Sequence, residues 1–357
     1  MRVPPTPPGD ALPRCAGSAA AATLARAGRR VIAVDPARFP ATTVSTHLLF
    51  AGGVAEPARV GALERVEKIG APRLSRAFIG GPGHASDGSY TPIDGVDYGL
   101  CVRRAALDQA LAENAREAGA EIRHGHRVTG ILWQDGRAVG VRVQDGHGHG
   151  HRHGGAEYEI RARLVVGVDG RRSTVARLVG ADRPRIAHAN GRACYYAYYE
   201  DPHRDWRSTA AMWLTGRELG NAFPCDGGLT LVLLMPPVDR AADFRGSLEA
   251  EFGRTEGLIP GLAARLAGLH PQHEDRQLRR APVVLPPLGR SRLGSDRRRG
   301  TLQGPRHGAG DPRRRALRHG AGARPAIVRA AASTLLELAG HRAEARRLLD
   351  VEAAPRT

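Results

Sequence analysis

Lysine and aromatic residues are the two classes that this chain of 357 residues mostly lacks. Lys68 is its single lysine, and Phe, Trp and Tyr together make up 4%. The net charge of +17 therefore comes from arginine, and a net +11 of it lies in residues 269–357, which contain no aromatic residue. Basic segments that bind nucleic acids normally mix lysine with arginine and carry aromatic side chains that stack on bases. We therefore expect no nucleic-acid partner.

Cysteine is also scarce, and the four cysteines (Cys15, Cys101, Cys194 and Cys225) show none of the spacings of a metal site. We expect them to be reduced. A tract with four histidines, residues 146–155, could hold a metal ion. An exposed hairpin loop is the simpler interpretation, because no carboxylate or cysteine is placed to complete a rigid site. We therefore expect no metal.

Long apolar runs are missing as well. No stretch could span a membrane, and residues 1–13 lack the apolar centre of a signal peptide. Apolar residues make up 41% of the chain, a value typical of soluble globular proteins. These observations predict a cytoplasmic protein, and the length allows one large domain or two modest ones.

Residues 14–35 contain the clearest functional pattern. They predict a phosphate-binding turn (Arg14, Cys15, Ala16, Gly17), an Ala-rich helix over residues 18–27 and an apolar, buried strand over residues 31–34. Gly17 would let the helix pack close to a strand and leave its N-terminal amides free for a pyrophosphate. Asp35 follows Gly17 by 18 residues, near the ~20-residue spacing of an acid that binds a ribose hydroxyl. The pattern is typical of the second half of a dinucleotide-binding βαβ unit.

The first half of that unit is absent as written. An apolar strand should lead into Arg14, but residues 1–13 contain five prolines, which a central strand does not tolerate. The N-terminal segment is therefore aberrant for such a fold.

Two further segments carry candidate residues. The loop after Asp35 contains Ser45, Thr46 and His47, which either contact a cofactor near its reactive end or cap the next helix. Residues 101–119 predict a helix with Arg103 and Arg104 at its N-terminal end, where a cation opposes the helix dipole and needs an anionic partner. A cofactor pyrophosphate would suit; the plainer alternative is a surface pair of Arg104 with Asp108.

A third segment joins a strand to a sharp turn. Residues 164–168 predict a buried strand that runs into Asp169 and Gly170, at the carboxyl end where open α/β sheets bind ligands. Ser173 can cap the following helix. Between these segments, the turn Asp135–Gly136 joins two alternating runs and predicts a hairpin. After Arg192, tyrosine-rich runs predict an antiparallel sheet that forms one wall of a substrate pocket.

Taken together, the motifs resemble the FAD-dependent monooxygenases related to p-hydroxybenzoate hydroxylase and the neighbouring geranylgeranyl-reductase group. The matching motifs are the turn RCAG with Asp35, the R-x-x-L-D-x-x-L helix at Arg104, and GxDGxxSxxxR over residues 167–177. The resemblance implies that Gly17 holds the FAD pyrophosphate, that Asp35 holds the adenosine ribose and that Arg104 helps bind the cofactor. It also implies that Asp169 and Gly170 lie near the pyrophosphate and the path of NAD(P)H.

The resemblance further implies an α/β fold of the glutathione-reductase type, a Rossmann-type FAD-binding domain with an inserted, mainly antiparallel substrate domain. We expect FAD-domain segments at 1–84 and 101–185, with 1–13 aberrant. Substrate-domain segments are expected at 85–100 and 186–268, followed by a poorly packed tail at 269–357.

The family also needs, near its end, a motif of Gly-Asp for the ribityl chain followed by Pro and Gly at the flavin, and this full motif is absent as written. Reading residues 269–314 in another frame, with third bases chosen freely, yields such a motif. We therefore hypothesise that one base was lost or gained near Gly268; resequencing the gene there would decide it.

The expected function is that of a flavoprotein oxidoreductase, with FAD as cofactor and NAD(P)H as co-substrate. We expect a monooxygenase that hydroxylates or epoxidises an apolar or aromatic small molecule. The alternatives are an FAD-dependent double-bond reductase of the geranylgeranyl type and a disrupted, inactive product that binds FAD weakly. No catalytic residue and no oligomeric state can be assigned from the sequence.

Overall fold

The computed structural model describes residues 15–36, 45, 47–146, 155–170, 173–182 and 191–271. Predictions that fall on residues 1–14, on Thr46, on the histidine tract at 147–153 and on residues 272–357 lie outside this part of the chain. Within the described ranges, the chain forms two regions that differ in the kind of sheet they contain.

The first region is built from an α/β unit. Helix α1 (Cys15–Arg26) leads into strand β1 (Ile32–Asp35), which pairs in parallel with β6 (Glu121–His124), in the register Ile32↔Glu121. Helix α4 (Arg104–Glu117) packs beside α1 and leads into β6. The helix predicted over residues 18–27 begins earlier, at Cys15, and so includes the predicted turn. The strand predicted over residues 31–34 is present as β1 but is half-buried, and the helix predicted over residues 101–119 is present as α4.

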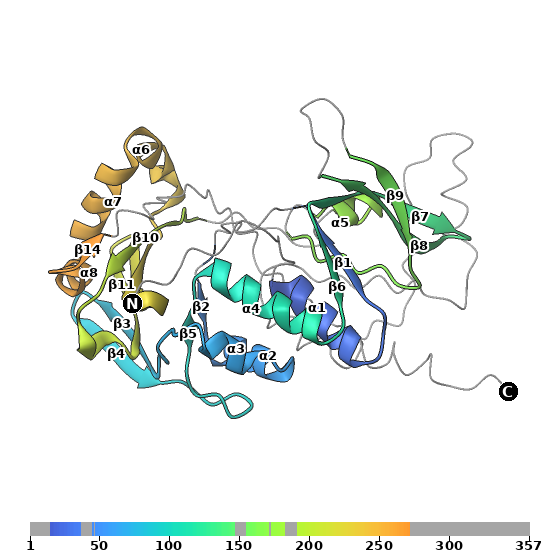
Figure 1. Ribbon diagram of the computed structural model, residues 1–357. Helices are drawn as coiled ribbons and strands as arrows, with labels where there is room; N and C mark the ends of the chain where they lie inside the picture. Colours follow the sequence, from blue (N-terminus) through green and yellow to red (C-terminus); the bar gives the residue numbers. More distant parts are fainter. Residues whose placement is uncertain are drawn as a thin grey trace, which may run out of the picture.

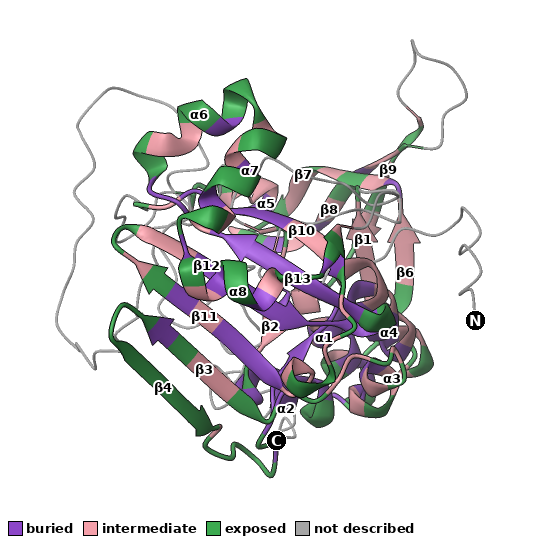
Figure 2. Ribbon diagram, turned by 90° about the vertical axis from the view of Figure 1, so that its left-hand side faces the viewer, coloured by how far each residue is buried: buried purple, intermediate pink, exposed green. Residues whose placement is uncertain are grey.

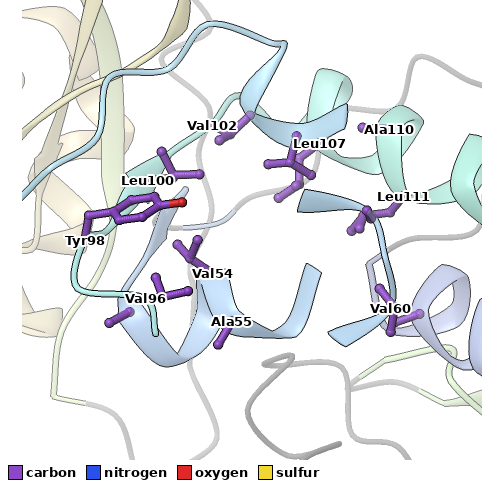
Figure 3. Close-up of a cluster of buried hydrophobic side chains, with 14 residues drawn as sticks. Val54, Ala55, Val60, Val96, Tyr98, Leu100, Val102, Leu107, Ala110 and Leu111 are labelled. Carbon is purple, nitrogen blue, oxygen red and sulfur yellow. The ribbon is translucent and has the colours of Figure 1, made fainter. Parts of the chain in front are cut away.

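Short elements complete this region. They are β2 (Leu48–Leu49), which pairs with β5 (Leu100–Cys101), and the helices α2 (Ala51–Arg59) and α3 (Leu63–Glu67). Val54, Leu100 and Leu107 lie in its core and are at most 2% exposed. Figure 3 shows these side chains converging between α2, β5 and α4.

A three-stranded antiparallel meander extends this region. It consists of β7 (His126–Gln134), β8 (Arg137–Asp145) and β9 (Glu157–Arg161). The hairpin predicted at Asp135–Gly136 is confirmed, because β7 and β8 meet at these two residues, both with positive φ.

The strand predicted over Leu164–Val168 is wrong. These residues are half-buried and form no named strand, and they lead through Asp169 and Gly170 into helix α5 (Thr174–Leu178). Gly167 nevertheless lies against that helix, since a Cβ there would be 2.8 Å from Val175 Cγ1. The close helix contact is therefore in place, while Gly167 forms only an isolated bridge and not the continuous ladder of a strand.

The second region is a seven-stranded sheet in the order β14-β10-β13-β12-β11-β3-β4, in which only β3 and β11 run parallel. Its strands are β3 (Arg76–Gly81), β4 (His84–Ser89), β10 (Tyr195–Glu200), β11 (Thr209–Thr215), β12 (Glu218–Pro224), β13 (Leu229–Leu234) and β14 (His270–Pro271). The antiparallel sheet predicted after Arg192 is confirmed.

Three helices, α6 (Ala241–Gly246), α7 (Leu248–Gly257) and α8 (Pro260–Leu266), lie between β13 and β14 in the chain. Helices α7 and α8 lie across one face of the sheet, over the buried strands β12 and β13 (Figure 2). Figure 1 shows this sheet at one end of the molecule, α1 to α4 in the middle, and β1, β6 and the meander at the other end. Among the described residues, no helix is both long and apolar enough to cross a membrane.

Candidate functional site

The N-terminal end of α1 carries three of the predicted turn residues. Cys15, Ala16 and Gly17 form the first turn of the helix, and Gly17 is buried. The backbone N–H and the thiol of Cys15 both donate to Asp108 Oδ1, at 3.2 Å and 2.9 Å. Burial raises the pKa of Cys15 to about 12, so this side chain is a thiol at neutral pH. The anion at the helix N-terminus in this structure is therefore the carboxylate of Asp108.

Arg104 lies beside that carboxylate. Its Nη2 donates to both oxygens of Asp108, at 2.9 Å and 3.0 Å, as in the plainer alternative for this residue. The pair is not a surface pair, because the side chains of Arg104 and Asp108 are only 14% and 3% exposed. Arg104 Nε is buried and has no hydrogen-bond partner within the described residues. One strong donor at this end of α1 is thus left for another acceptor.

Arg103 points to a different partner. Its Nε donates to Asp226 Oδ2 at 2.6 Å, and its backbone N–H donates to Asp226 Oδ1 at 2.9 Å. Asp226 is buried between β12 and β13 and lies 123 residues along the chain. No sequence signal indicated this contact, since its two residues are joined only by the fold. It ties the start of α4 to the seven-stranded sheet.

The predicted ribose-binding acid, Asp35, is the last residue of β1 and is half-buried, opposite His124 in the parallel pair. This is the carboxyl end of a parallel strand, where open α/β sheets place their ligands. The location agrees with the prediction, and the role in ribose binding stays a prediction.

The loop before β2 places His47 next to the tyrosine-rich sheet. Ser45 Oγ accepts a hydrogen bond from the backbone N–H of His47 at 3.1 Å. The ring of His47 is buried and meets Tyr198 of β10, with 3.2 Å between Nε2 and Oη. Neither residue caps helix α2, whose N-cap residue is Phe50 and has no side-chain cap. No sequence pattern indicated the contact with Tyr198.

Asp169 and Gly170 form the predicted turn before α5. Gly170 has φ +86°, a conformation that favours glycine. Asp169 accepts hydrogen bonds from the Ser173 hydroxyl and from the Val175 N–H, and Ser173 Oγ accepts from Ala176 N–H at 2.8 Å. Both side chains therefore cap a helix in this structure. A role of Asp169 and Gly170 near a cofactor stays a prediction.

The donors at the start of α1 fit the diphosphate end of a dinucleotide. They are the positive end of the α1 dipole and the guanidinium of Arg104 with its unpaired Nε. The absence of a side chain at buried Gly17 permits a diphosphate to approach the helix closely. Asp35 at the end of β1 supplies an acceptor for a ribose hydroxyl. The flavin end would need residues that follow Pro271 in the family's pattern, and these lie outside the described chain. The residues present thus fit the adenosine diphosphate end of FAD.

Comparison with known proteins was made by sequence and by structure. A family model described as "FAD binding domain" matches residues 15–195, just over half of the chain. The digeranylgeranylglycerophospholipid reductase of Methanosarcina mazei is 41% identical over 90 residues, covering 25% of this chain and 20% of the reductase. The rifampicin monooxygenase of Streptomyces venezuelae is 41% identical over 87 residues, covering 24% and 16%. The chain thus spans about a fifth of the length of these relatives.

A flavoprotein/dehydrogenase from Cytophaga hutchinsonii shares the fold, with a TM-score of 0.62 and 19% identity over 73% of this chain and 63% of that one. The expected FAD-binding fold, with mixed α/β content and antiparallel sheets, is therefore confirmed. By the match over residues 15–195, the chain belongs to the family of FAD-binding domains.

Proposed function

We propose that this chain is an FAD-dependent oxidoreductase, and specifically an NAD(P)H-dependent monooxygenase that hydroxylates or epoxidises an apolar or aromatic small molecule. The observation that carries the proposal is the donor set at the start of α1, where Arg104 keeps an unpaired Nε beside buried Gly17. It lies within the segment that matches the FAD-binding family. A helix N-terminus with a buried cation is suited to a diphosphate.

Each residue has a stated task in this proposal. Gly17 and Arg104 hold the pyrophosphate, Asp35 holds the adenosine ribose, and Asp169 with Gly170 borders the cofactor. FAD, when bound, supplies the hydride and oxygen chemistry. The tyrosine-bearing strand β10 covers the reactive end, orients the substrate and excludes water. The domain boundaries, NAD(P)H as the reductant and a cytoplasmic location belong to the same proposal.

A second candidate is an FAD-dependent double-bond reductase. It is favoured by the match to the digeranylgeranylglycerophospholipid reductase of Methanosarcina mazei, at 41% identity. The two candidates share the cofactor and differ in the use of oxygen. A third reading is a disrupted product that binds FAD weakly, which the proline-rich N-terminus and the arginine-rich tail favour.

Flavin content tests the proposal first. We expect the purified chain, reconstituted with FAD, to show the visible flavin absorption band after gel filtration. Gly17→Val should remove it, because a side chain would block the approach of a diphosphate to α1. Gly253→Val is the matched control, since a Cβ at that position of α7 would meet nothing within 4 Å. Absence of the band in the unsubstituted chain would favour the disrupted product.

Oxygen use separates the two enzymatic candidates. A monooxygenase consumes O₂ in step with NADPH oxidation when a substrate is present, whereas a double-bond reductase does not need O₂. Parallel measurement with an oxygen electrode and by NADPH absorbance distinguishes them. NADPH oxidation that proceeds unchanged under argon would contradict the monooxygenase.

A further inference from the structure

Two cysteines face each other where the two regions of the molecule meet. Cys101 is the last residue of β5, in the region of α1 and α4, and Cys225 directly follows β12 of the seven-stranded sheet. The two residues are 124 positions apart in the sequence, yet they form an isolated parallel bridge. Figure 1 shows β5 where the helices α2 to α4 adjoin that sheet. The bridge is therefore a direct contact between the backbones of the two regions.

The bridge brings the two cysteines to the separation that a disulfide requires. Neighbouring strands lie about 4.7–4.9 Å apart, within the roughly 4.4–6.8 Å that separates the Cα atoms of disulfide-linked cysteines. Both side chains are 0% exposed and belong to one apolar cluster, which also contains Cys194. A hydrogen bond joins the thiols of Cys101 and Cys225, so the two side chains point toward each other. Both are free thiols in this structure.

Two arginines hold the backbone on either side of this contact. Arg207 Nη2 donates to the C=O of Cys225 at 3.0 Å. Arg103, two residues after Cys101, is bound to Asp226 through its Nε and its backbone N–H, at 2.6 Å and 2.9 Å. The segments that carry the two cysteines are thus held together by noncovalent contacts before any covalent bond forms.

The same surroundings keep the pair reduced under mild conditions. Burial raises the pKa of the Cys101 thiol, and the hydrogen bond with Cys225 and the negative charge of Asp226 raise it further. The reactive thiolate is therefore scarce, and an oxidant reaches the pair only when the contact opens locally. We propose that Cys101 and Cys225 are a modification site, at which hydrogen peroxide closes a disulfide between β5 and the segment after β12.

The reaction consumes one peroxide for two thiols. The thiolate of one cysteine attacks an oxygen of hydrogen peroxide, which gives a sulfenic acid and releases hydroxide. The sulfur of the second cysteine then attacks the sulfenic sulfur, and the S–OH oxygen leaves as water. The two sulfurs together lose two electrons, the peroxide is reduced to two waters, and both thiol protons end in water. No flavin takes part, so the site is independent of the proposed function.

The disulfide locks the two regions together. Because it joins residues that are far apart in the chain, it restricts the unfolded state strongly. We expect the Tm of the oxidised protein to lie roughly 10 °C above that of the reduced protein. Reduction with dithiothreitol should reverse the shift.

Peptide mapping of the purified full-length chain tests the proposal. Trypsin, which cleaves after arginine, leaves the four cysteines in separate peptides, at residues 15–26, 77–103, 193–204 and 218–240. The folded protein is treated with hydrogen peroxide, alkylated with N-ethylmaleimide in urea and digested without reductant. We expect peptide 77–103 linked to peptide 218–240, with two hydrogens lost from their summed mass, while Cys15 and Cys194 carry the alkyl group.

Two controls separate the geometry of this pair from the reactivity of any cysteine. Cys194→Ala, in the same apolar cluster, should leave the link and the rise in Tm unchanged, whereas Cys101→Ala should abolish both. The unsubstituted chain, unfolded in urea before peroxide is added, should give a mixture of pairings, because nothing then holds Cys101 beside Cys225.

The map of the unsubstituted protein decides the proposal without relying on the folding of any variant. Four alkylated cysteines after peroxide treatment, a link to Cys194 in place of Cys225, or the same mixture of pairings in the folded and the unfolded chain would overturn it. An unchanged Tm in the linked protein would overturn the lock between the two regions.

Discussion

Strands β13 and β1 are both short and rich in branched apolar residues, yet they are buried to different degrees. All six residues of β13 are buried, between β10 and β12 and under α7. All four residues of β1 are half-buried, and within the described chain β1 pairs only with β6. A parallel strand needs neighbours and covered faces to become a core strand. The difference therefore lies in the partners of each strand and not in its own sequence.

The two sheets also differ in how much chain they require. Strands β11, β12 and β13 follow one another within residues 209–234 and pair in antiparallel fashion across short connections, whereas β10 pairs with β13 and β3 pairs with β11 across longer stretches of chain. The region around β1 combines segments that are far apart, and the segment before α1 lacks the residues of a central strand. The seven-stranded sheet therefore has a local meander at its centre, whereas the pairing of β1 with β6 joins segments that are far apart in the chain.

The largest expected effect lies in the seven-stranded region. Arg265 of α8 pairs with Asp201, next to β10, and their side chains are 1% and 0% exposed. The guanidinium also lies 5.5 Å from the ring centroid of Trp206. Arg265→Met leaves a buried carboxylate unpaired and should lower the free energy of unfolding by about 3–5 kcal/mol. Urea unfolding followed by tryptophan fluorescence measures this loss.

Its control is Arg254→Met, which removes an ion pair with Glu251 from the exposed side of α7. A surface pair contributes about 0–1 kcal/mol. If both variants lost the same stability, the Arg265–Asp201 pair would contribute no more than a surface ion pair, and its burial would not be what stabilises this region.

The contact between the two regions should make stability depend on pH. The pKa of His47 is lowered to about 4 by burial and by Arg104, whereas it is about 6.5 in an unfolded chain. The unfolded state thus binds a proton first, so stability is retained above pH ~6.5 and falls toward pH ~4, by up to about 3 kcal/mol. His47→Gln should flatten this part of the profile.

Urea unfolding at a series of pH values checks this prediction. Subtracting the stability profile of the His47→Gln variant removes the contributions of other titrating groups, such as Asp201. Burial acts to raise the pKa of Asp201, but hydrogen bonds from Arg265 and Thr230 outweigh it, so the pKa is lowered. If the free energy of unfolding changed with pH in the same way in the unsubstituted protein and in the His47→Gln variant, His47 would titrate as an exposed histidine.

A matched pair of substitutions compares the two sheets directly. Val232 of β13 is 0% exposed, and Val34 of β1 is half-buried. Val232→Ala should cost about 2–3 kcal/mol and Val34→Ala about 1 kcal/mol, because the buried methyl groups lose more contacts and leave a cavity. Equal losses in thermal or urea unfolding would mean that β1 is as well packed as β13.

The smallest expected effect concerns two adjacent arginines. Arg104→Gln should weaken FAD binding by about tenfold, or about 1.4 kcal/mol, because it removes the buried cation at the start of α1. Arg103→Gln should leave FAD affinity unchanged, since Arg103 serves Asp226 and the other sheet. Flavin fluorescence quenching measures both affinities. A larger loss of FAD affinity in the Arg103→Gln variant would mean that Arg103, and not Arg104, helps to bind the cofactor.

Local sequence patterns predicted most of the elements. The Ala-rich run became α1, the repeat of Leu107, Leu111 and Ala115 became the buried side of α4, and Asp135–Gly136 became a hairpin turn. Each depends on residues that are close in sequence, where propensity and periodicity act directly. The run Leu164–Val168 has an equally suitable composition, but a parallel strand needs a neighbour, and no local pattern reveals whether one is present.

The site was predictable only in its local parts. The acid at Asp35 follows from spacing and lies at the end of β1, whereas residues 15–17, predicted as a turn ahead of the helix, form the first turn of α1. The contacts of Arg103 with Asp226 and of His47 with Tyr198 join residues more than a hundred positions apart. Such contacts arise from the packing of one region on the other, which single-sequence patterns do not encode.

The proposal that α1, β1 and α4 hold the adenosine diphosphate end of FAD is open to a competition experiment, with FAD bound to the purified chain and ADP or FMN added as competitor. We predict that ADP displaces FAD, whereas FMN, which lacks the adenosine end, does not. Displacement by FMN as effective as that by ADP, or no effect of ADP, would contradict it.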